Sequence, residues 1–104
     1  MRLTIIADDG CICVDGVCYL GINMPELDPL IHAVQWYGEY GEIEYKSVFN
    51  SGVVTRAPNT YIDNINNFEW ALGLFEAAKI AQETANAEIA AAEAQPTSFG
   101  TQTL

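Results

Sequence analysis

Hydrophobic and polar residues alternate over the first half of the chain, which predicts short β-strands separated by turns. Residues 2–20 predict three strands, with Asp8-Asp9-Gly10 as the first turn and Asp15-Gly16 as a two-residue hairpin turn. Residues 21–31 contain two prolines and are expected to form a connecting loop.

A second hairpin is expected from His32–Tyr37 and Glu42–Val48, with the turn at residues 38–41. Asn50-Ser51-Gly52 indicates one more turn before a last short strand at residues 53–55. We therefore expect five or six short antiparallel strands, most of them paired with a neighbour in sequence, in a β-meander.

The pattern changes to a helical period near residue 66. Asn66 as N-cap places Glu69 at N3, a capping box, and the same register pairs Ile65 with Trp70 as a hydrophobic staple. The helix is expected to end at Gln95, because Pro96 disfavours helical geometry in the residue before it. Residues 96–104 are polar and aperiodic, and we expect this tail to bind an adjacent surface. The prediction is an α+β chain: an antiparallel β-domain at 1–62, a long Ala-rich helix at 63–95 and an extended tail at 96–104.

One side of the predicted helix carries apolar or small residues at alternating spacings of three and four, as in a coiled coil. We call these residues the heptad seam: Phe68, Ala71, Phe75, Ala78, Gln82, Ala85, Ile89 and Ala92. A helix over residues 67–94 would be about 42 Å long, whereas a sheet domain of this size is roughly 28 Å wide. The first half of the helix is therefore expected to lie on the sheet, and the second half to project towards another chain. The alternative is that the whole seam packs on its own domain.

A homo-oligomer is expected, and a trimer would fit. Glu88 and Glu93 would face like charges in a parallel helical pair, and Gln82 in the seam would fix register at some cost in stability. A trimer held mainly by its sheet domains, or a heterologous partner, is therefore easier to reconcile with the sequence than a long parallel coil.

Composition narrows the choice of partner. The chain has 104 residues and a formal net charge of −10, which argues against nucleic acid and against an anionic membrane surface. The sequence shows neither a secretory signal nor an apolar run long enough to span a membrane. We expect synthesis in a cytoplasm and protein partners.

The three cysteines, Cys11, Cys13 and Cys18, fall on one face of the predicted hairpin that turns at Asp15-Gly16. The turn at Asp15-Gly16 places Cys13 opposite Cys18, close enough for a disulfide. Reduced, packed thiols are the favoured interpretation. A Cys13–Cys18 disulfide formed after release into an oxidising medium and a metal site remain alternatives.

Other reactive residue types are interpreted structurally. His32 is expected to be a hydrogen-bonded histidine at a strand end. Glu42 and Glu44 alternate with apolar residues, as on a half-exposed strand, and Asp8, Asp9 and Asp15 lie in predicted turns. We predict no catalytic residues, no cofactor and no metal. Aromatic residues gather in the second hairpin, and those on one face are expected to pack in the core. For the other face we expect a role in an interface, to which we assign Trp36 and Tyr37, or, with Tyr40, in binding a sugar.

Residues 1–70 resemble short bacteriophage proteins associated with tail fibres and tail tips. The resemblance rests on Val14-Asp15-Gly16-Val17 with Tyr19 and Gly21, on residues 31–38 (IHAVQWYG) and on residues 41–45 (GEIEY). It implies a small β-domain followed by a helix, a place in the virion or its assembly, other tail proteins as partners, and no enzymatic activity. The sequence therefore predicts a structural subunit of the tail fibre or baseplate. A tail-fibre assembly chaperone that leaves the particle and a small carbohydrate-binding module are the alternatives.

Overall fold

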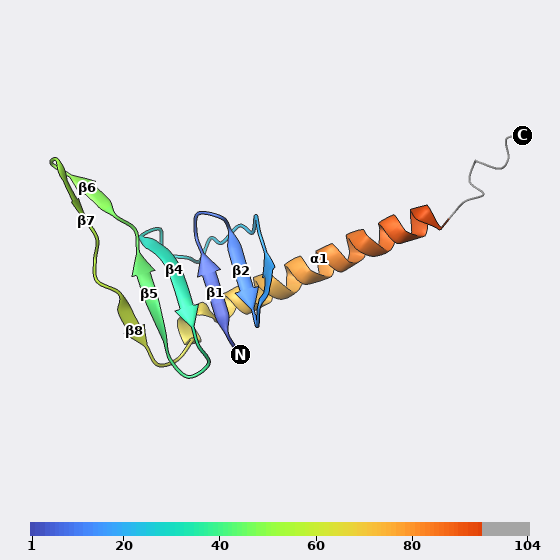
Figure 1. The fold of residues 1–104 in the computed structure, drawn as a ribbon, viewed down its shortest axis with the longest axis horizontal. Coiled ribbons are helices and arrows are strands. Elements are labelled where there is room, and N and C mark those ends of the chain that lie inside the picture. Colours follow the sequence, from blue (N-terminus) through green and yellow to red (C-terminus); the bar gives the residue numbers. More distant parts are fainter. Residues whose placement is uncertain (95–104) are drawn as a thin grey trace, which may run out of the picture.

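The computed structural model describes residues 1–94. It contains an antiparallel sheet, a separate two-stranded ribbon and one long helix (Figure 1). The strands are β1 (Leu3–Ile6), β2 (Cys11–Val14), β3 (Val17–Tyr19), β4 (Ile31–Trp36), β5 (Gly41–Tyr45), β6 (Val48–Asn50), β7 (Val53–Thr55) and β8 (Thr60–Ile62). A 3₁₀ turn at Asn66–Phe68 leads into the helix α1, Glu69–Glu93. The α+β prediction is confirmed.

The main sheet has the strand order β3-β2-β1-β4-β5-β8. Most neighbours are consecutive in sequence, as expected, but β4 pairs with β1 and β8 pairs with β5. The predicted turns are present: Asp15 and Gly16 both have positive φ, at 49° and 87°, which is the geometry of a tight type I′ hairpin. Residues 21–30 form the expected connection between β3 and β4.

The predicted return strand at Glu42–Val48 is wrong in one respect, because it is divided. Its first part is β5, and its second part, β6, leaves the sheet and, among residues 1–94, pairs only with β7. The strand β8 was not predicted, and the described residues form eight strands where five or six were expected. We call the β6–β7 ribbon the arm; its turn is formed by Ser51 and Gly52, which have positive φ of 52° and 82°.

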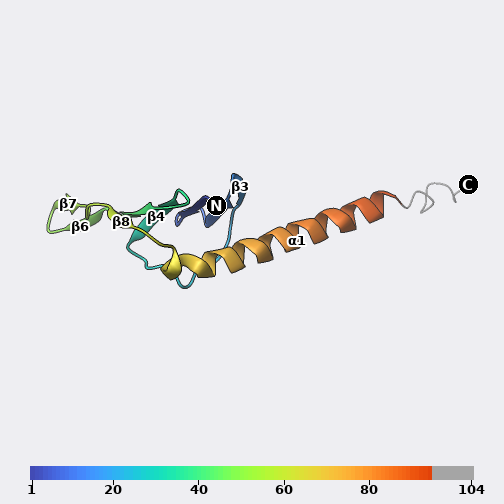
Figure 2. The same ribbon diagram turned by 90° about the horizontal axis from the view of Figure 1, so that it is seen from below.

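The core lies between α1 and one face of the sheet. Side chains from alternate positions of the four inner strands point to this face, and Phe68 of the 3₁₀ turn and Ala71 and Phe75 of the helix cover them. The buried sheet residues on this side are Leu3, Ile5, Ile12, Val34, Trp36 and Ile43. Figure 2 shows the helix beneath this face, crossing it and continuing past β3.

The predicted helix start is wrong. The α-helix begins at Glu69 with Phe68 as N-cap and no side-chain capping bond, so the capping box at Asn66 and the staple of Ile65 with Trp70 do not form in the predicted register. Instead, the Asn66 amide donates to the side chain of Asn64 at 3.0 Å, and the Phe68 amide donates to the Ile65 carbonyl at 2.8 Å. These local hydrogen bonds give the backbone amides of Asn66 and Phe68 acceptors in a 3₁₀ turn before the helix. The predicted helix end at Gln95 and the tail at 96–104 lie outside the described residues.

The described part of the chain is elongated, with extents of 71 × 36 × 19 Å and a radius of gyration of 20.1 Å. A compact domain of similar length would have a radius of gyration of about 12 Å. The projecting helix accounts for much of this difference, and the arm extends the other end of the molecule (Figure 1).

Candidate protein-docking surfaces

The heptad seam is divided into a covered half and an open half. Phe68, Ala71 and Phe75 are buried against the sheet. Beyond them, Ala78 and Ala85 are half-buried, and the remaining positions, Gln82, Ile89 and Ala92, are exposed. The prediction that the helix lies on the sheet and then projects is confirmed, and the alternative that the whole seam packs on its own domain is wrong.

The two exposed isoleucines of α1 differ in their position around the helix. Ile80 is 55% exposed and Ile89 is 57% exposed. Nine positions separate them, so at 3.6 residues per turn they point to opposite sides of the helix. Ile89 continues the seam and Ile80 does not. The projecting half therefore has one large apolar side chain that continues the seam, Ile89, and a matched one outside it, Ile80.

The arm is a second exposed apolar surface. Its cross-strand pair Phe49 and Val54 is 71% and 66% exposed, and Val48 and Val53 are also exposed. At its base, a groove of about 410 Å³ lies among Leu30, Tyr45, Lys46, Val48, Thr55, Arg56 and Ala57. Sequence reasoning found the turn but missed the arm, because an apolar strand that leaves its sheet has the same pattern as one that stays in it.

A cluster of tyrosines forms at the end of the second hairpin. Tyr37 and Tyr40 have ring centroids 5.2 Å apart, and Tyr61 of β8 stacks on Tyr40 at 6.1 Å. The Arg2 guanidinium lies 5.0 Å from the centroid of Tyr37, a cation–π distance. All three rings are exposed. The prediction of Trp36 as an interface residue is wrong: Trp36 is buried in the core, because strand alternation turns it towards the helix.

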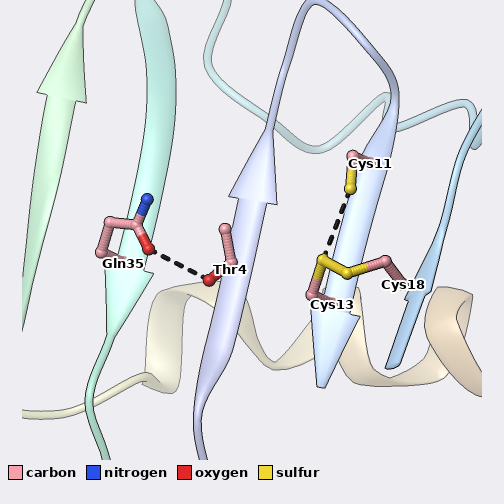
Figure 3. The surroundings of a disulfide bond; sticks show 5 residues. All are labelled: Thr4, Cys11, Cys13, Cys18 and Gln35. Atoms are coloured by element: carbon pink, nitrogen blue, oxygen red, sulfur yellow. Dashed lines mark hydrogen bonds between the residues drawn. A yellow bond between two sulfur atoms is a disulfide. The ribbon is translucent and has the colours of Figure 1, made fainter. Parts of the chain in front are cut away.

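The three cysteine sulfurs lie together on the sheet face opposite the helix (Figure 3). Cys13 and Cys18 are joined by a disulfide, with Cα atoms 4.0 Å apart, and the Cys11 sulfur is 3.5 Å from that of Cys13. The favoured interpretation of three reduced thiols is therefore wrong for Cys13 and Cys18, although their predicted pairing is confirmed. The bond joins residues that face each other directly across the β2–β3 hairpin.

Cys11 remains a buried free thiol. Burial, and to a smaller extent the negative charge of Asp9, raises its pKa. Because the nucleophilic form of cysteine is the thiolate, this environment lowers the reactivity of the thiol.

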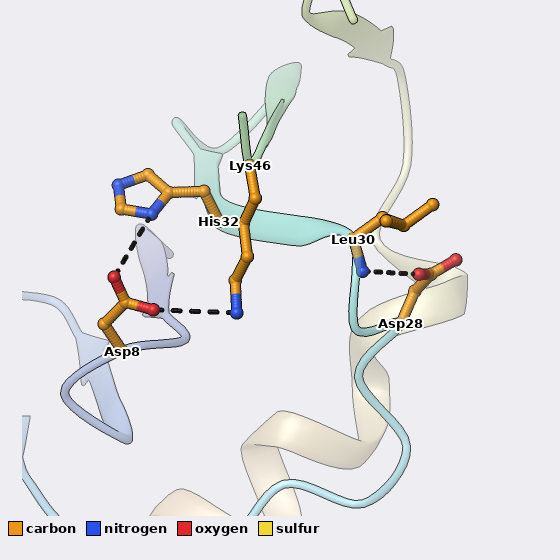
Figure 4. Close-up of polar contacts among 5 residues, drawn as sticks. All are labelled: Asp8, Asp28, Leu30, His32 and Lys46. Atoms are coloured by element: carbon orange, nitrogen blue, oxygen red, sulfur yellow. Dashed lines mark hydrogen bonds and ion pairs between the residues drawn. The ribbon is translucent and has the colours of Figure 1, made fainter. Parts of the chain in front are cut away.

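His32 and Lys46 approach one carboxylate from neighbouring strand ends (Figure 4). The Asp8 carboxylate lies 3.9 Å from His32 Nδ1 and 3.6 Å from Lys46 Nζ. All three side chains are substantially exposed, so these pairs contribute little to stability. The histidine is close to its predicted place, as the second residue of β4, but within residues 1–94 its side chain has an ion-pair contact with Asp8 and not the expected hydrogen bond.

The acidic residues of β5 lie as expected. Glu42 and Glu44 are half-buried and alternate with the buried Ile43. Glu39 lies in the exposed hairpin turn, and no hydrogen bond joins these carboxylates to one another within residues 1–94. The half-exposed strand prediction is confirmed.

No family model, curated protein or solved structure matches this chain. In the part of the chain that the structure describes, no helix is long and apolar enough to cross a membrane.

Proposed function

We propose that the chain is a non-enzymatic structural subunit of a bacteriophage tail, in the fibre or baseplate region, that docks other subunits through its projecting helix. The observation that carries this proposal is the continuation of the heptad seam beyond the sheet. The same helix side that buries Phe68 and Phe75 in the core presents Ile89 to solvent.

The physical argument concerns the projecting half of α1. Most helical stability in proteins comes from packing of an apolar face, yet the residues after Ala85 are all exposed as far as Ala94. Alanine at most positions gives a high helix propensity and permits close approach of a second backbone. A docking partner would convert this exposed stretch into buried area.

The bacteriophage part of the proposal rests on the resemblance of residues 1–70 to short tail-associated proteins. The residues that carry it build the sheet and the Asp15-Gly16 turn. The excess of negative charge, −10 in 104 residues, is consistent with partners that are proteins and not nucleic acid.

Mass spectrometry of purified virions tests the proposal by quantifying this chain against the major tail protein. A fixed stoichiometric ratio is the expected result, and its value would indicate the symmetry of the ring or fibre. Absence from particles together with abundance in infected-cell lysate would contradict it and indicate an assembly chaperone.

A second candidate function, glycan binding, is favoured by the exposed cluster of Tyr37, Tyr40 and Tyr61. Stacked, solvent-facing rings are a common surface for sugars. Glycan-array binding that is abolished by Tyr40→Ala and retained by Phe49→Ala, an aromatic truncation on the arm, would support this function. Trp36→Ala is unsuitable for the test, because Trp36 is a core residue.

A further inference from the structure

The arm exposes more apolar surface than its own pairing can stabilise. In the described part of the chain, β6 and β7 pair only with each other, and Phe49, Val53 and Val54 are all more than half exposed. A two-stranded hairpin is marginally stable in water unless another surface covers one of its faces. The arm and the groove at its base therefore form a surface that is suited to a partner.

The charge of this surface is unusual for the molecule. The segment from Lys46 to Ala57 contains two of the four basic residues of the chain and none of its 14 acidic residues. Lys46 and Arg56 flank the groove, which is otherwise lined mainly by apolar side chains such as Leu30 and Val48. The partner for this surface should combine an apolar side chain with flanking carboxylates.

The projecting half of α1 has this combination. Residues 80–94 contain Glu83, Glu88 and Glu93 and no basic residue. On the helical wheel, Glu93 lies 40° to one side of Ile89 and Glu88 lies 100° to the other. Ile89 is thus an exposed apolar side chain between two carboxylates.

The two surfaces lie at opposite ends of one molecule (Figure 1), so they can meet only between copies. We propose that the groove at the base of the arm binds the projecting half of α1 from a second copy of this chain, with Ile89 in the groove and Glu88 and Glu93 near Lys46 and Arg56. This inference deepens the proposed function and rests on it, since it names the partner of the seam.

The contact is heterologous, because the arm of one copy meets the helix of another. Such a contact leaves one free arm and one free helix in every dimer, and it generates a ring or an open filament. A parallel helical pair would bring Glu88 and Glu93 of one copy close to the same glutamates of the other, and the heterologous contact avoids this repulsion. The ion pair of Lys46 with Asp8 is exposed and weak, so Lys46 can leave Asp8 and pair with a glutamate of the second copy.

The test is sedimentation velocity of the full chain and two variants, Ile89→Asp in the helix and the double variant K46E/R56E in the groove. The wild type should form dimers and larger species as its concentration rises, and each variant alone should remain monomeric. An equimolar mixture of the two variants should recover one dimer species, because one intact helix and one intact groove remain. Ile80→Asp is the matched control, with equal exposure on the opposite side of the helix, and should associate as the wild type does.

Three results would overturn the inference: a monomeric wild type at roughly 100 µM, self-association of both variants, or no dimer in their mixture. If Ile89→Asp abolishes association but K46E/R56E does not, the seam is an interface and the arm is not its partner. Virion mass spectrometry is independent of these results, so the proposed function and this inference can fail separately.

Discussion

Gly41 begins β5 directly against Trp36 of the neighbouring strand. A Cβ atom at Gly41 would lie 2.3 Å from the Gln35 carbonyl oxygen and 3.1 Å from Cε3 of Trp36. The backbone of Gln35 and Trp36, and then the indole, occupy the space that a side chain would need, so the glycine permits the close approach of β5 to β4 and the burial of the ring.

We expect Gly41→Ala to destabilise the chain by about 1–3 kcal/mol, the usual cost of forcing extra volume into a packed site. Urea unfolding measures the change. Gly73→Ala is the control, since nothing lies within 4 Å of the added Cβ on the exposed side of α1. It should leave stability unchanged or raise it by up to ~1 kcal/mol. Equal effects of the two substitutions would contradict this account of Gly41.

Cys11 gives a prediction of thiol reactivity. Its raised pKa keeps the buried thiol protonated in the folded chain at a pH where the unfolded chain already forms thiolate. Alkylation by iodoacetamide at pH 8 should therefore be at least roughly tenfold slower in the folded protein than in urea. The difference should narrow as the pH rises towards the folded pKa. Mass mapping identifies the labelled residue, and equal rates at pH 8 would exclude a protected thiol.

At the scale of the elements, α1 consists of two halves with different roles. Phe75 is buried against the sheet and its ring packs on Tyr19 at 5.2 Å between centroids. Ile89 is on the same side of the helix and is 57% exposed. The same type of substitution should therefore have unequal effects at the two positions.

We expect Phe75→Ala to cost about 3–5 kcal/mol, as for other buried aromatic residues. Ile89→Ala should change stability by no more than about 0.5 kcal/mol when it is measured at a concentration where the chain is monomeric. Chemical denaturation followed by tryptophan fluorescence reports both, because Trp36 lies in the core. A large loss from Ile89→Ala in the monomer would show that the helix does not project.

The sequence predicted those elements whose signals are local. The Asp15-Gly16 turn, the second hairpin and the division of the helix follow from turn chemistry, alternation and length. The pairing of β1 with β4 was not predictable in this way, because it joins residues about 30 positions apart through tertiary contacts.

The failures of the candidate-site prediction have physical causes as well. Trp36 and Tyr37 are adjacent and aromatic, and only the direction of the strand decides which of them is buried. At the helix start, the backbone bond from Phe68 to Ile65 competes with side-chain capping at Asn66. Whether Cys13 and Cys18 form a disulfide depends on the redox conditions around the protein, which the sequence does not specify.

At the scale of the whole molecule, shape and charge distribution act together. The chain places its basic, acid-free segment at one end and its acidic helix at the other, so copies placed side by side in the same direction would bring like charges together, whereas a head-to-tail arrangement brings opposite charges together. Because salt screens exposed charges, this attraction between the two ends weakens as the ionic strength rises. The elongated shape is the feature on which this arrangement depends, because it keeps the two ends from meeting within one copy.

Small-angle X-ray scattering of the Ile89→Asp variant tests the shape without interference from association. The described residues have a radius of gyration of 20.1 Å, whereas a compact chain of this length would give about 13 Å. We expect a value near the larger figure, with the elongated distance distribution of a rod attached to a sheet. The Ile80→Asp variant at low concentration is the control for the substitution itself. A value near the compact figure would mean that the helix folds back over the open sheet face, which would remove the structural basis for docking through its projecting half.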